Sequence, residues 1–322
     1  MRAVVGIDLG GTLVRAGALD PEGQLLAWAE TPIEAARGPA AGVQRITGLV
    51  HDILRQIGAV QLLGIGIGST GPVDRQLGAI QNPHTLPTWE NVDVVSPLQD
   101  HFGVPVTLEN DADAAALGEY WRGAGGGLDR LVMVTVGTGI GAAFVYRGEI
   151  YRGVQGHHPE TGHNVIDASG PPCYCGACGC WESLASGPAI ARRAQEAVLE
   201  AATPTSLLAR AGGDVTAIDA RLVAEAAAGG DLLARQVIAE SARYLALGLV
   251  NVIQFLLPQR IILGGGVMRS YELFRPVVES VITQHNVMAP THLVEMRPAL
   301  LGQQAGVVGA GYAVYQLLQG EK

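Results

Sequence analysis

The sequence predicts an α/β protein with two lobes, and three observations support this prediction. The chain has 322 residues, enough for two domains of about 150 residues each, and 48% of them are hydrophobic, which suits large buried cores. Short apolar segments of strand character alternate with longer segments that carry apolar residues at helical spacing. A pattern of strand, glycine-rich turn and strand also occurs twice, about 130 residues apart in the sequence, as expected for duplicated lobes.

The repeated pattern is a β-hairpin with polar residues at its bend. Residues 3–19 (AVVGIDLGGTLVRAGAL) carry Asp8 and Thr12 there, and residues 131–151 (LVMVTVGTGIGAAFVYRGEIY) carry Thr138. Glycine-rich turns expose backbone N–H groups that can hold phosphate oxygens without any lysine. Each turn by itself is equally typical of an ordinary tight hairpin, in which glycine is the usual residue.

Between the two hairpins we expect a helix over residues 39–57 and a buried strand that runs into a Gly/Pro loop over 62–74. Residues 81–94 hold too many prolines for a helix and predict an irregular surface loop, where binding residues often lie. Residues 104–108 predict a strand and residues 113–121 an alanine-rich helix.

Asn110 and Asp111 lie at this junction of strand and helix, which is where α/β sheets place ligands. Both residue types also cap helix N-termini, and a cap alone would explain either of them. Together with Glu109 they exceed what one cap needs, so a catalytic carboxylate is a candidate here.

Beyond residue 185 we expect helices over 187–200 and 219–256, a buried strand over 259–268 that ends in three glycines, and a helix of small residues over 304–318. The last helix can pack back on the first lobe. None of the glycine clusters fits the dinucleotide pattern GxGxxG with a later acidic residue, which makes a Rossmann site improbable. We divide the chain into a small lobe, 1–118 with a helix at about 303–322, and a large lobe, 119–302.

All four cysteines fall in one segment, residues 160–182 (ETGHNVIDASGPPCYCGACGCWE). Their loops are too short for a disulfide framework, and thiolates with an imidazole favour tetrahedral zinc. Gly176 and Gly179 would let the backbone turn tightly enough for the sulfurs to share an ion. Five candidate ligands leave open an all-thiolate site or three thiolates with His163, and reduced thiols or an iron–sulfur cluster are weaker alternatives.

The charge balance excludes several classes of function. The net charge of −9 disfavours nucleic acid as a partner, and the only lysine is Lys322, which excludes a P-loop lysine, a Schiff base and a kinase-type strand lysine. No apolar run approaches the roughly 18 residues of a membrane span, and the N-terminus enters a strand directly. We therefore expect a soluble, cytoplasmic protein without a membrane partner.

Together these residues resemble the ROK family of sugar kinases and repressors. The match consists of Asp8-Leu-Gly-Gly-Thr12, Glu109-Asn110-Asp111 before Leu117-Gly118-Glu119, Gly137-Thr138-Gly139-Ile140-Gly141, and Glu160-x-Gly162-His163 followed by Cys173-x-Cys175-Gly176-x-x-Gly179-Cys180-x-Glu182. It extends through Gly264-Gly265-Gly266 to the helix that begins Ala305-Gly306. Each piece is weak by itself except the cysteine signature, which is highly specific.

The resemblance implies an actin-like, RNase H-like pair of lobes with a zinc-binding insertion, which closes over ATP and a hexose. It implies that Asp111 is the general base that takes the proton of the 6-hydroxyl. The implied sugar-binding residues are Asn110, Asp111, Glu160, His163 and Glu182, with Gly71 and Asn82 as further candidates. The implied nucleotide and Mg²⁺ residues are Asp8, Gly10, Gly11, Thr12, Gly137, Thr138, Gly139, Gly264 and Gly265. The implied ligands of a structural zinc are His163, Cys173, Cys175 and Cys180, which leaves Cys178 as the spare thiol.

The chain departs from the family pattern at a few positions. Leu13 stands where many members carry Lys or Asn, and His157-His158-Pro159 resembles the fructokinase branch, whereas Cys173-x-Cys175 resembles glucokinases. Glucose is the expected hexose, with N-acetylglucosamine, N-acetylmannosamine, mannose and fructose as alternatives. A sugar-sensing regulator of the same family is the second expectation, which we rank lower because Val4 already lies in the first strand and leaves no space for a DNA-binding segment. A homodimer or homotetramer is expected.

Overall fold

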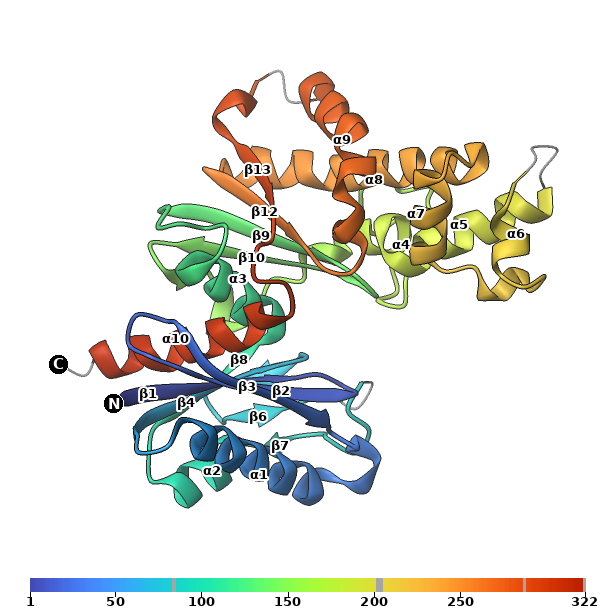
Figure 1. Cartoon of the computed structure of the whole chain (residues 1–322). Coiled ribbons are helices and arrows are strands. Elements are labelled where there is room, and N and C mark those ends of the chain that lie inside the picture. The colour runs from blue at the N-terminus through green and yellow to red at the C-terminus, as the bar shows by residue number, and fades with distance from the viewer. Residues whose placement is uncertain (83–84, 201–204, 286–287, 321–322) are drawn as a thin grey trace. The chain divides into compact units, whose positions relative to one another are not determined.

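A computed structural model describes residues 1–82, 85–200, 205–285 and 288–320. The chain forms two compact units (Figure 1). Unit 1 contains residues 1–133, 143–159 and 299–322, and unit 2 contains residues 134–142 and 160–298. Residues 83 and 84 of the predicted loop, and the last two residues of the predicted C-terminal segment, lie outside the described residues.

Unit 1 is an α/β unit that includes both described ends of the chain. Its strands are β1 (Arg2–Leu9), β2 (Leu13–Leu19), β3 (Leu25–Pro32), β4 (Gln61–Ser69), β5 (Val73–Asp74), β6 (Ala79–Ile80), β7 (Val92–Asp93), β8 (Val106–Asn110) and β11 (Glu149–Ile150). Its helices are α1 (Pro39–Ile57), α2 (Val95–Phe102), α3 (Asp111–Arg122) and α10 (Ala305–Gly320).

The main sheet of unit 1 has the order β3-β2-β1-β4-β8. The predicted hairpin is the antiparallel pair β1–β2, while β4 runs parallel to β1 and β8 parallel to β4. Asp8 therefore pairs with Gly68, and Gly68 pairs with Glu109, at the carboxyl ends of three parallel strands. This edge of the sheet holds the residues that the sequence singled out.

The two faces of this sheet bury different helices (Figure 1). Val5, Ile7 and Leu9 alternate along β1 and share one core with apolar residues of α1, whereas Val4 belongs to a second core with residues of α10. At Gly6 the helix comes so close that a Cβ atom would lie 1.9 Å from the carbonyl oxygen of Val307. The expectation that the last helix packs on the first segment is confirmed.

The segment 81–94 was predicted to be a surface loop, and this is wrong in part. Leu86 and Trp89 are fully buried in the core that α1 covers. The ring of Trp89 fills the space beside Gly42 of α1, where a Cβ would lie 2.2 Å from the ring. Prolines correctly predicted the irregular backbone, but they do not report where the apolar side chains between them pack.

Strands β9 (Arg130–Val136) and β10 (Ile140–Tyr146) form the second predicted hairpin, in a sheet of order β11-β10-β9-β12-β13. The division between the units falls inside both strands. The other elements of unit 2 are α4 (Trp181–Ala185), α5 (Gly187–Glu200), α6 (Leu207–Arg210), α7 (Ala220–Ala228), α8 (Leu232–Leu256), β12 (Arg260–Gly264), α9 (Tyr271–His285) and β13 (Glu295–Pro298).

The helix predicted over 219–256 is two helices, α7 and α8. Gly230 has a φ of 95°, which ends the helical path of the backbone. Asp231 then caps α8 by accepting a hydrogen bond from the Ala234 N–H at 3.0 Å. The apolar spacing continues across the break because both helices bury one face, so periodicity alone did not reveal it. Among the described residues, no helix is both long and apolar enough to span a membrane.

Candidate functional site

Asn110 ends β8 and Asp111 begins α3, at the carboxyl edge of the unit 1 sheet. Asn110 is the N-cap, since its side-chain oxygen accepts a hydrogen bond from the Ala112 N–H at 2.8 Å. The Asp111 carboxylate also accepts from Ala112, at 2.9 Å. Capping therefore accounts for the side-chain oxygen of Asn110, whereas Asp111 is not needed as a cap.

Asp111 combines solvent access with a perturbed acidity. Desolvation by the surrounding protein raises its pKa to about 6, and the negative charge of Asp8 adds to the rise. The hydrogen bond from Ala112 and the positive charge of His158 act in the opposite direction. The side chain remains exposed, so this carboxylate can meet a ligand and exchange a proton near neutral pH.

Asp8 lies at the end of β1 and is paired with a cation. Its Oδ2 is 3.2 Å from the Nη1 of Arg15, its cross-strand neighbour on β2. Burial raises the pKa of Asp8, and Arg15 opposes that rise. Gly11 and Thr12, in the turn that follows, are exposed. The turn therefore offers exposed backbone beside a carboxylate, as expected for a phosphate and metal site.

Gly71, Asn82 and Asn110 lie together in unit 1. A Cβ on Gly71 would lie 2.5 Å from the side-chain nitrogen of Asn110. Asn82 is buried, donates to the Gly71 carbonyl and accepts from the Thr85 N–H at 3.1 Å. The two weaker sugar-binding candidates are thus neighbours of a stronger one, and Asn82 holds the loop in place.

Glu109 and Asp113, two positions before and two positions after Asp111, belong to a buried ionic network. The sequence analysis did not predict this network. Glu109 binds Arg75 at 2.7 Å and Arg152 at 2.6 Å, and Asp113 binds His158 Nδ1 at 2.8 Å. Both carboxylates are at most 3% exposed. Buried carboxylates require such partners. The only available signal was the spacing, with an acidic residue two positions before and two positions after Asp111.

Glu119, quoted above only for its place in the family pattern, is completely buried and binds backbone. Its carboxylate accepts hydrogen bonds from the N–H groups of Ala124, Leu300 and Leu301 at 2.7 to 3.1 Å. This residue ties α3 to the chain that enters α10. Its role is structural, and no local sequence feature indicates it.

In unit 2, the second glycine-rich turn is held by other glycines. Gly137 accepts a hydrogen bond from the N–H of Gly187, the first residue of α5, at 2.8 Å. A Cβ on Gly265 would lie 2.4 Å from the carbonyl oxygen of Val136. Thr138 is exposed at the tip of the turn. The structure therefore brings together the second hairpin turn and the glycines that follow β12.

Glu182 lies in the first turn of α4 and contacts the same hairpin. Its Oε2 accepts a hydrogen bond from the Ile140 N–H at 2.8 Å. A Cβ on Gly139 would lie 2.4 Å from this oxygen, so a larger residue there would displace the Glu182 carboxylate. Glu160 is exposed just before the short turn that contains His163.

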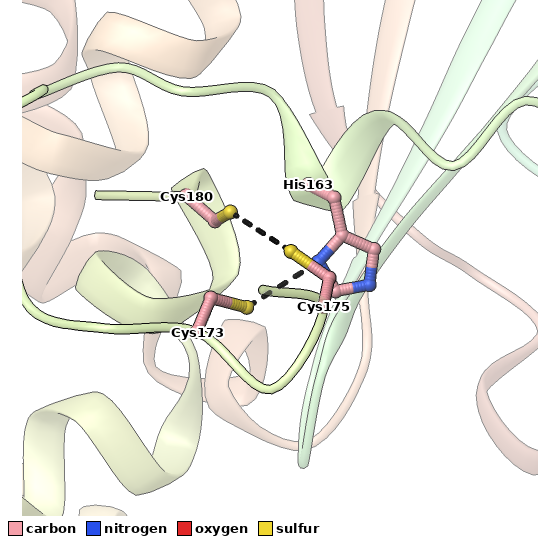
Figure 2. Close-up of side chains that lie close together, drawn as sticks. All are labelled: His163, Cys173, Cys175 and Cys180. Atoms are coloured by element: carbon pink, nitrogen blue, oxygen red, sulfur yellow. Dashed lines mark hydrogen bonds between the residues drawn. The ribbon is translucent and has the colours of Figure 1, made fainter. Parts of the chain in front are cut away.

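Figure 2 shows the cysteine segment and His163. The side chains of His163, Cys173, Cys175 and Cys180 point toward one another, and their ligand atoms all lie within 4.8 Å of one another. His163 Nδ1 lies 3.5 Å from the Cys173 sulfur, and the sulfurs of Cys175 and Cys180 are 3.5 Å apart. Gly176 and Gly179 both have positive φ, as the tight turns required. Cys178 is exposed and outside the cluster.

This donor set fits zinc. Three sulfurs and one imidazole nitrogen at these separations match the composition and size of a tetrahedral structural site, in which all positions are taken by protein. The residues that would hold the ion are therefore His163, Cys173, Cys175 and Cys180. An ion there would fix the loop between the 3₁₀ turn at residues 161–163 and α4. Because protein atoms would fill all four coordination positions, none would be open for catalysis.

Tyr174 extends from the cysteine loop to His163, which sequence reasoning did not foresee. Its hydroxyl lies 3.2 Å from His163 Nε2, and the two rings meet edge to face. Desolvation raises the pKa of Tyr174 to about 12, and the negative charge of Glu182 adds to the rise. His163 was expected to serve as both a metal ligand and a sugar-binding residue, and in the structure its Nε2, which faces away from the sulfurs, has the Tyr174 hydroxyl as a partner.

Two α/β units with mixed five-stranded sheets and a His–Cys₃ cluster define a protein of the actin-like fold with a zinc-type site. A family model described as "ROK family" matches residues 4–316. The chain belongs to the ROK family.

Three relatives illustrate what this chain is similar to. It is 33% identical to a glucokinase of Halalkalibacterium halodurans over 318 residues, which is 98% of this chain and 96% of the relative. It is 28% identical to the xylose repressor of Bacillus subtilis over 307 residues, 95% of this chain and 75% of the repressor. A crystal structure of a ROK family glucokinase from Streptomyces griseus, in complex with glucose and AMPPNP, has a TM-score of 0.79 and 31% identity, covering 96% of this chain and 98% of that one.

Proposed function

We propose that this protein is an ATP-dependent hexose kinase that transfers the γ-phosphoryl group of ATP to the 6-hydroxyl of glucose. The observation that carries the proposal is the state of Asp111, an exposed carboxylate at a helix start whose pKa is raised to about 6. Similarity over nearly full length to a glucokinase supports the choice of reaction, and a related structure holds glucose and an ATP analogue.

Asp111 acts as the general base in this proposal. The attacking hydroxyl must lose its proton as the bond to phosphorus forms, and a carboxylate with a pKa near 6 is deprotonated at neutral pH yet basic enough to take it. In phosphoryl transfer the protein otherwise mainly positions the reactants and balances charge. Asp111 holds the hydroxyl that reacts, whereas Asn110, with Gly71 and Asn82 beside it, binds another hydroxyl of the ring.

Glu160, His163 and Glu182 bind the remaining sugar hydroxyls. Carboxylates accept hydrogen bonds from hydroxyl groups, and an imidazole whose Nδ1 faces the cysteines presents Nε2 as a donor. All three residues lie within the cysteine segment, Glu160 and Glu182 at its two ends. Bound zinc would supply rigidity to this segment and no acid–base chemistry.

The glycine-rich turns bind ATP. Gly10, Gly11 and Thr12 in one hairpin, and Gly137, Thr138 and Gly139 in the other, present backbone N–H groups and hydroxyls to phosphate oxygens, with Gly264 and Gly265 in the nucleotide site. Asp8 is the carboxylate that would hold Mg²⁺, which neutralises phosphate charge when bound. Arg15, paired with Asp8, adds a positive charge that Leu13 cannot.

Asp111→Asn tests the proposed base. The amide keeps the size and the hydrogen bond from Ala112 but cannot accept a proton, so kcat should fall by at least about 10²-fold, the lower end of general-base contributions, with glucose affinity largely kept. The measurement is ADP release with Mg²⁺, ATP and a panel of hexoses, together with calorimetric titration of glucose. Turnover equal to wild type would refute the base assignment.

The second candidate is a sugar-sensing regulator, which the similarity to a xylose repressor favours. A gel-shift assay with promoter and random DNA, with and without sugar, separates the two candidates, because a kinase should leave DNA unshifted. The hexose panel in the ADP-release assay also ranks glucose against N-acetylglucosamine, N-acetylmannosamine, mannose and fructose.

A further inference from the structure

The starting observation is the position of the Tyr174 hydroxyl within the cysteine segment. It lies 3.2 Å from His163 Nε2, and the negative charges of Glu182 and Glu160 both act on it. These are the three residues of unit 2 to which the proposed function assigns sugar binding. Tyr174 itself stands between two residues of the metal cluster, Cys173 and Cys175, and its own side chain takes no part in that cluster.

The direction of the hydrogen bond between Tyr174 and His163 follows from the imidazole. Nδ1 of His163 faces the cysteine sulfurs, and with a metal on Nδ1 the ring proton must sit on Nε2. Nε2 then donates, and the Tyr174 oxygen accepts. The Tyr174 hydroxyl therefore accepts the one hydrogen bond that the imidazole can donate on this side.

A sugar hydroxyl would compete for the same donor. It too would accept a hydrogen bond from the Nε2–H of His163. One imidazole N–H has a single proton to give. The phenol and the sugar hydroxyl cannot both bind at full strength at once.

We propose that Tyr174 is an affinity-determining residue that occupies the position of a hexose hydroxyl in the unliganded protein and must leave it when the sugar binds. This inference rests on the proposed function. Movement of the side chain is inexpensive, because Tyr174 is 84% exposed and loses no core contact when it turns away. The cost that remains is the hydrogen bonding of its hydroxyl.

Tyr174→Phe tests the proposal, because it removes the hydroxyl and keeps the ring. Glucose should bind about 2- to 10-fold more tightly to the variant, the range that one net hydrogen bond represents. Calorimetric titration of glucose gives the Kd, and mass spectrometry should find one zinc per chain in both proteins. An unchanged or weaker Kd, or loss of zinc from the variant, would overturn the proposal. Tyr151→Phe, a change at another exposed tyrosine, is the matched control and should leave the Kd as it is.

A second measurement separates failure of this inference from failure of the proposed function. The Nε2–H proton of His163 can be followed by ¹H–¹⁵N NMR without any sugar, and it should exchange with water faster in Tyr174→Phe than in wild type. Equal exchange in the two proteins would overturn the contact itself. If exchange accelerates but the wild-type protein binds no hexose of the panel, the hydrogen bond between Tyr174 and His163 is supported. The proposed function then fails, and so does the proposed competition between Tyr174 and a sugar.

Discussion

At the scale of single residues, the proposed chemistry depends on the charges around Asp111. Its pKa of about 6 is the sum of desolvation and Asp8, which raise it, and of the Ala112 hydrogen bond and His158, which lower it. His158 is held in place by Asp113 at 2.8 Å, and Asp113 is also 3.9 Å from Arg152. Because the base works only when deprotonated, kcat/KM should rise with pH through this pKa.

His158→Gln should move that rise to higher pH. Glutamine can still donate a hydrogen bond to Asp113 but carries no positive charge, so the pKa of Asp111 increases when the change removes a group that lowers it. The measurement is the pH dependence of kcat/KM for glucose. His157→Gln is the control, since His157 is exposed and one residue earlier in the chain. An acidic limb at the same pH in His158→Gln and wild type would contradict the prediction.

At the scale of elements, the cysteine segment has little regular structure to stabilise it. Residues 161–180 contain a single turn of 3₁₀ helix and two isolated bridges before α4 begins at Trp181. Its four metal-capable side chains are separated by up to 17 positions in the sequence, from His163 to Cys180. A structural zinc ion can contribute on the order of 10 kcal/mol to the folding of such a segment.

Cys180→Ser should abolish stoichiometric zinc binding and lower the melting temperature, because serine is a poor zinc ligand at a completely buried position. Cys178→Ser is the matched control: it lies two residues earlier, is exposed and is outside the cluster. Zinc per chain, counted by mass spectrometry, and thermal unfolding provide the two readouts. Loss of zinc from Cys178→Ser, or its retention in Cys180→Ser, would show that the ligand set is different.

At the scale of the whole molecule, the last helix of the chain, α10, packs against both α3 and β4 of unit 1. Gly309 of α10 lies against α3, where a Cβ would be 1.6 Å from the carbonyl oxygen of Ala114. Gly66 of β4 meets the same helix at Ala310, at 1.8 Å for a built Cβ. A glycine in each of these two contacts, α10 with α3 and α10 with β4, lets the backbones approach more closely than any side chain permits. Asp111 begins α3, so the contact also supports the proposed base.

Gly309→Ala should destabilise the protein by at least about 1–3 kcal/mol, since the added methyl group forces backbones apart. Gly48→Ala is the control on another helix: a Cβ there meets nothing within 4 Å, and alanine should stabilise α1 by up to about 1 kcal/mol. Urea unfolding curves of both variants provide the check. The packing argument would fail if Gly309→Ala were as stable as wild type.

The residues of the proposed sites belong to two units, and the sequence describes them only as separate motifs. Asp8, Asn110 and Asp111 belong to unit 1, whereas Glu160, His163, Glu182 and the glycines 137–139 belong to unit 2. The motifs were recognisable because each is local: a turn, a helix start or a cysteine cluster has its own residue pattern. The hairpins, α1, α5, α10 and a metal-type cysteine cluster follow from such patterns, whereas the choice of four ligands among five candidates came from the family resemblance.

What the sequence by itself determined is the set of groups with chemistry to offer and the elements that carry them, because hydrophobic periodicity, turn residues and ligand spacing act over a few positions. Only the tertiary structure decided what each group contacts. It buried Trp89 and Leu86, paired Glu109 and Asp113 with Arg152 and His158, and brought Glu182 to Ile140. These contacts join residues far apart in the chain, and their energy comes from burial and charge pairing, which no short stretch of sequence encodes.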